Sequence, residues 1–232
     1  MTKARAPREL LGRWLADAAD EDDRVIVLDA DLGRSTRLDE FEARHPGQLI
    51  QLGVAEQNAV GVASGLAYAG LRPVFVSMAM FAAGLPWTQL RMAAYAGLDL
   101  LVIGSHPGLD IGPDGGTHQM LEDLALMRVI PEFRVLCPSD TGETAQALAW
   151  ALNASGPTYL RLGRHPVPDL AHATPYRPGE AEIVCAQPSP LVLVAEGSMV
   201  AVAVAVARAL PQPGASVVDI RSVKPLDDVL LR

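Results

Sequence analysis

Short apolar runs alternate with helical patterns along most of this chain. The runs have the length of strands and occur at residues 25–29, 49–53, 73–77, 99–104, 133–137 and 158–162. Apolar residues at helical spacing occur at residues 8–20, 56–69, 86–97, 119–128 and 141–154. Strands that alternate with helices predict an α/β fold, in which helices flank a parallel sheet on both faces.

The last part of the chain has a different pattern. Residues 166–182 contain several prolines and predict a linker. Within residues 183–232, a strand at 191–195, a helix at 197–210 and a strand at 216–220 predict one βαβ unit. Because a lone βαβ unit leaves apolar faces uncovered, we expect it to pack against another surface.

Charge and cysteine content exclude several classes of function. The net charge of −8 argues against a nucleic-acid partner or an anionic membrane surface. The sequence has no uncharged apolar run of 18 residues, and its start, MTKARAPREL, lacks the apolar segment of a signal peptide. Cys137 and Cys185 lie outside any metal-type spacing, so we expect reduced thiols and a cytoplasmic location.

A single carboxylate, Glu56, stands at a strand-to-helix junction. It follows the apolar run that ends at Gly53, and it begins a helix of small residues that closes at Gly70. An unpaired buried charge there would cost several kcal/mol, on the order of other buried ions. A helix dipole alone would also favour glutamate in the first turn, by roughly 0.3–1 kcal/mol. Taken alone, Glu56 fits either explanation.

A glycine-rich loop brings two histidines and an aspartate together. Residues 104–119, GSHPGLDIGPDGGTHQ, contain His106, Asp114 and His118 among five glycines. The loop follows the apolar residues 98–103, which predict a buried strand. Loops at the carboxyl ends of parallel strands commonly bind ligands, so we predict a polar site that handles protons. Either histidine alone would also fit a solvated surface position.

Several segments together resemble the pyrimidine-binding domain of transketolase. They are GVAEQNAVG (53–61), SMAMFAAG (77–84), LRMAA (90–94), SHPGLDIGPDGGTHQ (105–119), LEDLALMRVIPEFRVLCPSD (121–140) and PTYLRLGR (157–164). The resemblance extends over essentially the whole chain and is strongest to the C-terminal subunits of split, two-chain transketolases. It implies a pyrimidine-binding domain at residues 1–165 and a truncated transketolase C-terminal domain at residues 183–232.

The resemblance implies a thiamine diphosphate site. Glu56 would hydrogen-bond N1′ of the aminopyrimidine and promote loss of the C2 proton of the thiazolium. Phe81 would stack on the pyrimidine ring, although it would also fit plain core packing. Met78 stands where single-chain transketolases usually carry an aromatic residue, and Gly84 is usual for split forms.

The resemblance also implies transfer of a two-carbon ketol unit from a ketose, or ketose phosphate, to an aldehyde. His106 and His118 would line the substrate channel, bind carbonyl and hydroxyl groups and shuttle protons. Asp114 would contact the C2 hydroxyl. Arg164 would bind the sugar phosphate, unless it is a surface residue, and Arg161 is a second candidate for an anion contact.

A separate subunit is expected. Thiamine-diphosphate enzymes hold the diphosphate through Mg²⁺ bound by a GDG motif and a distal Asn, and this sequence has no GDG. The resemblance therefore implies an N-terminal transketolase subunit that carries this motif and holds the metal. Since two sites need two copies of each chain, we expect an α2β2 heterotetramer.

Three alternatives remain at this point. Deoxyxylulose-phosphate synthases share the GGTHQ-like segment but usually differ at the position of His106. The β subunits of 2-oxo acid dehydrogenases have a similar glutamate but carry HSQ in place of THQ. A non-catalytic scaffold would fit the short C-terminal domain and Met78. An enzyme is favoured by the intact set Glu56, Phe81, His106, Asp114 and His118.

Overall fold

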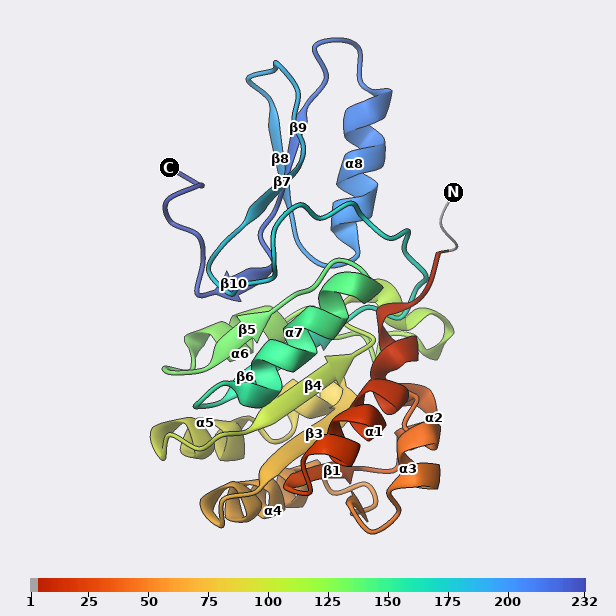
Figure 1. Ribbon diagram of the computed structural model, residues 1–232, viewed down its shortest axis with the longest axis vertical. Helices are drawn as coiled ribbons and strands as arrows, with labels where there is room; N and C mark the ends of the chain where they lie inside the picture. Colours follow the sequence, from red (N-terminus) through yellow and green to blue (C-terminus); the bar gives the residue numbers. More distant parts are fainter. Residues whose placement is uncertain (1–3) are drawn as a thin grey trace.

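Two β-sheets organise the computed structural model, which describes residues 4–232 (Figure 1). In spatial order, the strands of the larger sheet are β10 (Ser222–Lys224), β5 (Arg134–Leu136), β6 (Thr158–Leu162), β4 (Leu101–Ser105), β3 (Arg72–Met78), β1 (Val25–Asp29) and β2 (Leu49–Gln51). Strands β1 to β6 run parallel to their neighbours, and β10 is antiparallel to β5. The mostly parallel sheet predicted from the sequence is confirmed.

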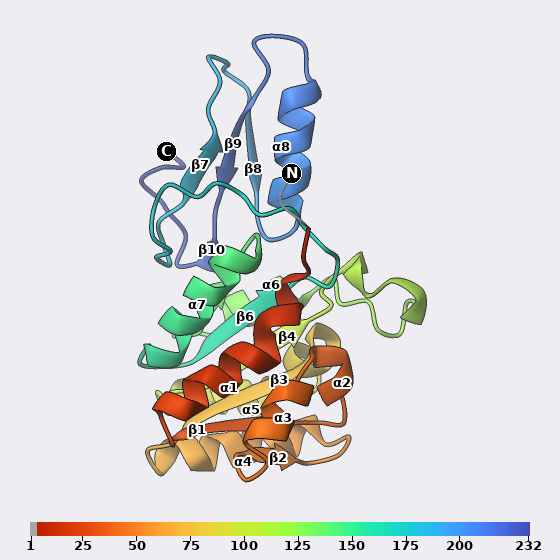
Figure 2. The same cartoon turned by 45° about the vertical axis from the view of Figure 1, so that its right-hand side comes forward.

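Helices cover both faces of the large sheet (Figure 2). One face packs against α1 (Leu11–Glu21), α3 (Asp39–Arg44) and α7 (Thr141–Asn153). The other packs against α4 (Glu56–Tyr68), α5 (Trp87–Tyr95) and α6 (Asp123–Val129). Neighbouring residues of a strand point to opposite faces, so Val74 and Phe75 of β3 enter different cores. This burial on both sides explains why the strands are nearly continuous apolar runs.

Some elements differ from the sequence prediction. The helix expected at 119–128 begins at Asp123, because the carbonyl of Met120 accepts a hydrogen bond from Gly108 N at 2.7 Å and keeps the chain extended. The short helices α2 (Gly33–Thr36) and α3 were not predicted. None of the helices within residues 4–232 combines the length and apolarity that a bilayer span requires.

The smaller sheet contains the predicted βαβ unit. Strand β8 (Val192–Ala195), helix α8 (Met199–Ala209) and strand β9 (Ser216–Asp219) follow in order, with β8 and β9 parallel. Strand β7 (Glu182–Cys185) adds an antiparallel edge. One face packs on α8, and Val192 on the sheet is exposed. Some apolar surface of this unit is thus uncovered, as a lone βαβ unit predicts.

The end of the described chain returns to the large sheet. After β9, strand β10 pairs with β5, which the sequence did not reveal. Lys224 Nζ donates to the carbonyl of Arg128 at 3.0 Å and so ties β10 to α6. The smaller sheet therefore lies at one end of the large sheet, and the chain that follows it returns to add β10 to the large sheet (Figure 1).

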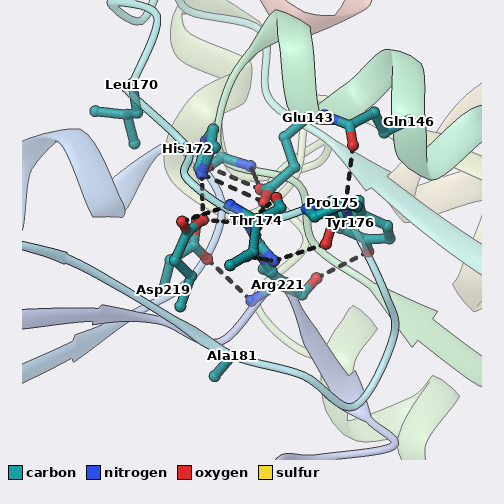
Figure 3. A network of polar contacts seen from close by, with 12 residues as sticks. Glu143, Gln146, Leu170, His172, Thr174, Pro175, Tyr176, Ala181, Asp219 and Arg221 are labelled. Carbon is teal, nitrogen blue, oxygen red and sulfur yellow. Dashed lines mark hydrogen bonds and ion pairs between the residues drawn. The ribbon is translucent and has the colours of Figure 1, made fainter.

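A buried polar network holds residues 166–182 between the two sheets (Figure 3). Arg221 is only 1% exposed, and its Nε lies 2.8 Å from Glu143 Oε1 of α7. Arg221 Nη2 also donates to Glu182 of β7. His172 places Nδ1 2.9 Å from Glu182 Oε2. The network thus joins a helix of the large sheet, the connecting segment and the smaller sheet.

Two members of this network have altered proton affinities. Burial alone would lower the pKa of His172, but the neighbouring carboxylates raise that pKa to about 9. Burial, and then the charge of Glu143, raise the pKa of Asp219 to about 7. Glu143, His172 and Asp219 bring ligand atoms within 4.8 Å, as a metal site would, but Arg221 already provides Glu143 with a cation.

Replacing Asp219 by asparagine should stabilise the protein at alkaline pH. The folded state binds a proton on Asp219 up to about pH 7, whereas the unfolded carboxyl, with a pKa of 3.8, has lost it. Wild-type stability from this group therefore falls as pH rises from about 4 to about 7 and is level at higher pH. We expect the gain in the free energy of unfolding from Asp219→Asn, relative to wild type, to be about 2 kcal/mol larger at pH 8.5 than at pH 5.5. Urea titrations at both pH values, with Asp228→Asn as the exposed control, would measure this; destabilisation at pH 8.5 would contradict it.

Candidate active site

Glu56 is the first residue of α4, at the edge of the large sheet where β2 ends. Gly53, with φ +66°, makes the left-handed turn between strand and helix. Glu56 is only 5% exposed, yet its carboxylate has no hydrogen bond or ion pair within residues 4–232. Since buried polar groups are normally hydrogen-bonded, the Glu56 carboxylate can accept a hydrogen bond from a bound molecule or from solvent.

Phe81 lies on a π-helical turn, Met80–Gly84, directly after β3. Such turns are rare and are frequent at functional sites. The Phe81 ring meets the His118 imidazole edge to face, with centroids 5.3 Å apart and planes at 82°. Gln57 Nε2 donates to the carbonyl of Leu85 at 3.2 Å. This bond ties the end of the π-helical turn to the first turn of α4.

His106 follows β4 in a strained backbone conformation. Its φ of +56° is uncommon for a residue other than glycine and is typical of functional sites. The ring is buried, with 3% of the residue exposed, and Nδ1 lies 2.8 Å from Ser105 Oγ. Ser105 pairs in register with the buried Met78 of β3. Met78 and His106 therefore lie at the same end of the sheet.

Burial and two arginines, opposed in part by Asp110 and Asp114, set the proton affinity of His106. Burial, followed by the charges of Arg8 and Arg164, lowers the pKa of His106 to about 4, so the ring is neutral at pH 7. Burial and the guanidiniums of Arg37 and Arg164 also lower the pKa of Arg8. Within residues 4–232, Arg8 Nε is buried without a hydrogen-bond partner. Guanidinium groups close enough to lower one another's pKa suit an anion.

The loop between β4 and α6 projects from the sheet, in yellow-green in Figure 2, and is fixed to the residues after β6. Arg164 Nη1 donates to the carbonyl of Ile111 and lies 4.0 Å from Asp114 Oδ2. The carboxylate of Asp110 accepts from the backbone N–H of Arg164. These contacts bring Asp114 and Arg164 together beside His106, although their positions in the sequence are far apart.

Arg161 does not belong to this cluster. The sequence suggested it as a second anion contact, but its Nε lies 2.8 Å from Asp123 Oδ2 and its Nη1 lies 2.8 Å from Glu196 Oε1. Asp123 is fully buried, so Arg161 is already neutralised inside the protein. Arg8, by contrast, acts on His106 in the folded chain but was not identified as a candidate from the sequence. Arg8 lies in a short 3-10 turn, Pro7–Leu10, and no local motif marks it.

Comparison with known protein families shows to which family this chain belongs. The chain matches "Transketolase, pyrimidine binding domain" over residues 3–169 and "Transketolase, C-terminal domain" over residues 179–232. The chain belongs to the transketolase family. The resemblance inferred from the sequence is therefore confirmed for the family, with its pyrimidine-binding domain and its C-terminal domain.

Split transketolases are among the relatives. The chain is 36% identical over 218 residues to a 6-deoxy-6-sulfo-D-fructose transketolase subunit of Clostridium sp. (strain MSTE9), covering 92% of this chain and 67% of that protein. It is 32% identical over 231 residues to a transketolase C-terminal section of Methanocaldococcus jannaschii, covering 97% and 73%. A solved split-gene transketolase, described as an inactive β4 tetramer, superimposes with a TM-score of 0.87 at 36% identity, covering 99% of this chain and 76% of that one.

Longer members of the superfamily also match. The 1-deoxy-D-xylulose-5-phosphate synthase 2 of Geobacter sulfurreducens is 34% identical over 227 residues, which is 96% of this transketolase-family chain but 36% of that protein. The chain thus spans about a third of the length of this relative. Since these synthases share the domain, membership of the family alone does not define the donor substrate.

Proposed function

We propose that this protein is the pyrimidine-binding subunit of a two-component, thiamine-diphosphate-dependent transketolase. The enzyme would transfer a two-carbon ketol unit from a ketose to an aldehyde. The observation that carries the proposal is the Glu56 carboxylate, which is nearly buried at the start of α4 and has no donor within residues 4–232. A ring nitrogen that shares a proton with Glu56 would satisfy it.

The residues near Glu56 fit an aminopyrimidine ring. Phe81 offers an aromatic surface on the segment tied to the first turn of α4, and Met78 offers a thioether from the end of β3. One polar anchor among apolar side chains is typical of a site for a planar cofactor. Glu56 would hold N1′ and exchange a proton with it. When bound, thiamine diphosphate supplies the electron sink for the carbon–carbon chemistry.

The loop after β4 would bind the sugar. His106 and His118 would contact its oxygen atoms, and Asp114 would contact the C2 hydroxyl. Arg8 and Arg164, the two arginines that act on His106, would bind a terminal anion. A phosphate fits this pair, and a sulfonate, as in the substrate named for the Clostridium relative, has a similar charged face.

A second subunit would complete the site. The sequence has no GDG motif, so we propose an N-terminal subunit that holds the diphosphate and Mg²⁺ in an α2β2 heterotetramer in the cytoplasm. The solved split-gene relative is described as inactive when it is a β4 tetramer. Val54, two residues before α4, is 79% exposed, and Tyr68, the last residue of α4, is 87% exposed. Such apolar exposure at both ends of α4 would suit a partner chain.

Reconstitution tests the proposal. The chain is co-expressed with a subunit that carries GDG and a distal Asn, and binding of thiamine diphosphate with Mg²⁺ is measured by calorimetry for each chain and for the pair. Ketol transfer is then assayed with phosphorylated and unphosphorylated ketoses. We expect tight binding and turnover only with both chains. Absence of cofactor binding in a stable complex would favour the scaffold, and turnover with pyruvate and release of CO₂ would favour a synthase.

Replacing Arg164 by lysine should weaken binding of a phosphorylated sugar. Lysine keeps the charge but loses the planar fork that binds two phosphate oxygens together. We expect KM for the phosphorylated substrate to rise about tenfold, with kcat changed little. KM for an unphosphorylated aldehyde serves as the internal control, and the exposed Arg128→Lys as the matched variant. An equal rise in KM for both substrates would argue against a phosphate contact.

A further inference from the structure

The hydroxyl of Ser105 has two contacts inside the protein. Ser105 Oγ donates to the carbonyl oxygen of Ser77 at 3.2 Å, across the neighbouring strands β3 and β4. The same Oγ lies 2.8 Å from Nδ1 of His106. Ser105 is fully buried, so water does not compete with either contact. The hydroxyl is therefore placed between a fixed acceptor and the imidazole ring.

Counting protons assigns the ring tautomer. A carbonyl oxygen accepts but cannot donate, and a hydroxyl has only one proton to give. If Ser105 gives that proton to Ser77, its contact with His106 is a hydrogen bond only when Nδ1 carries a proton. The other tautomer would take the Ser105 proton and leave the contact with Ser77 without one. Only the Nδ1–H form of the neutral ring satisfies both contacts.

The surroundings of the ring keep it neutral and, within residues 4–232, leave Nε2 without a hydrogen bond. Arg8 and Arg164 both act on His106 and disfavour added positive charge there.

We infer that Ser105 is a positioning residue, which holds His106 with the proton on Nδ1 and leaves Nε2 as a hydrogen-bond acceptor. The consequence for catalysis rests on the proposed function. Nε2 would accept a hydrogen bond from a sugar hydroxyl and could not donate one to a carbonyl. Because the pKa of His106 is about 4, the ring would orient this hydroxyl and would not retain its proton. Donation to the substrate carbonyl would fall to another group, such as His118.

The protonation of the two ring nitrogens of His106 can be measured directly by NMR. The full chain, with all five histidines labelled with ¹⁵N, is examined at pH 7.5 by long-range ¹H–¹⁵N correlation, and His106→Gln assigns the signals of His106. We expect a protonated Nδ1 and an unprotonated Nε2 in the wild type. Ser105→Ala should move the His106 signals toward the Nε2–H form, and Ser105→Thr should restore them. Thr117 lies 2.9 Å from Nδ1 of His118, so Thr117→Val should move only the His118 signals.

Activity of the assembled two-chain enzyme gives a second measurement. Ser105→Ala should lower kcat/KM about tenfold, and Ser105→Thr should recover most of it. An Nε2–H tautomer in the wild type, or His106 signals unchanged in Ser105→Ala, would overturn the inference. The expected tautomer in a complex without ketol transfer would leave the role of Ser105 intact and refute the proposed function instead.

Discussion

Replacing Glu56 by glutamine should lower kcat for ketol transfer by at least about a hundredfold. Glutamine has nearly the same shape and fits the same place at the start of α4, where Glu56 is nearly buried. Its amide can hydrogen-bond a ring nitrogen but cannot exchange a proton with it. Rates are measured in the complex with the partner subunit, at saturating thiamine diphosphate and Mg²⁺.

Two controls separate chemistry from binding in this experiment. The dissociation constant of thiamine diphosphate, measured by calorimetry, should change far less than kcat, because most of the cofactor contacts would remain. Glu42→Gln, an exposed substitution on α3, should leave the rate unchanged. A Glu56→Gln enzyme with a rate within about threefold of wild type would remove Glu56 from the mechanism, since a general acid–base group contributes more than this.

Of the substitutions considered, replacing Arg221 by methionine should cause the largest decrease in the free energy of unfolding. Arg221 is buried, lies 2.8 Å from the Glu143 carboxylate and also pairs with Glu182. Methionine fills part of the space but leaves two buried carboxylates with less compensation. Breaking a buried ion pair from one side costs about 3–5 kcal/mol. Urea unfolding at pH 7 measures this change.

The matched control for this experiment is Arg177→Met. Arg177 is exposed and forms a surface ion pair with Glu180, so its loss should cost about 1 kcal/mol or less. Adding Glu143→Gln to Arg221→Met should recover part of the stability, because it removes one uncompensated charge. Equal costs for Arg221→Met and Arg177→Met would show that the network in Figure 3 contributes little to stability.

The large sheet was predictable because its signal is local. Each parallel strand is buried on both faces, so runs such as 99–104 stand out from the helices between them. Strand β10 has no such signal. It is three residues long, and its pairing with β5 depends on how the smaller sheet is placed. A short edge strand of this kind is visible only in the folded chain.

The residues of the candidate site also fall into those that the sequence indicates and those that only the folded chain reveals. The loop with His106, Asp114 and His118 was identified from its composition and its place after a strand, and Glu56 and Phe81 from the resemblance. Arg8 was missed because its nearness to His106 comes from tertiary packing alone. Arg161 is the opposite case, a candidate whose side chain is already paired inside the protein. Its two acidic partners come from other parts of the chain, so the sequence around it gave no sign that its charge was already matched.

The return of β10 to the large sheet has a consequence for how the chain is divided into autonomous pieces. In the folded chain β10 pairs with β5 along the border of the sheet. A fragment that ended before β7 would lack β10. The backbone N–H and C=O groups on the edge of β5 that faces away from β6 would then be unpaired and able to recruit a strand from another molecule. The family boundary between the two domains is therefore not a boundary between the two sheets. By pairing with β5, strand β10 occupies the edge at which such recruitment would occur.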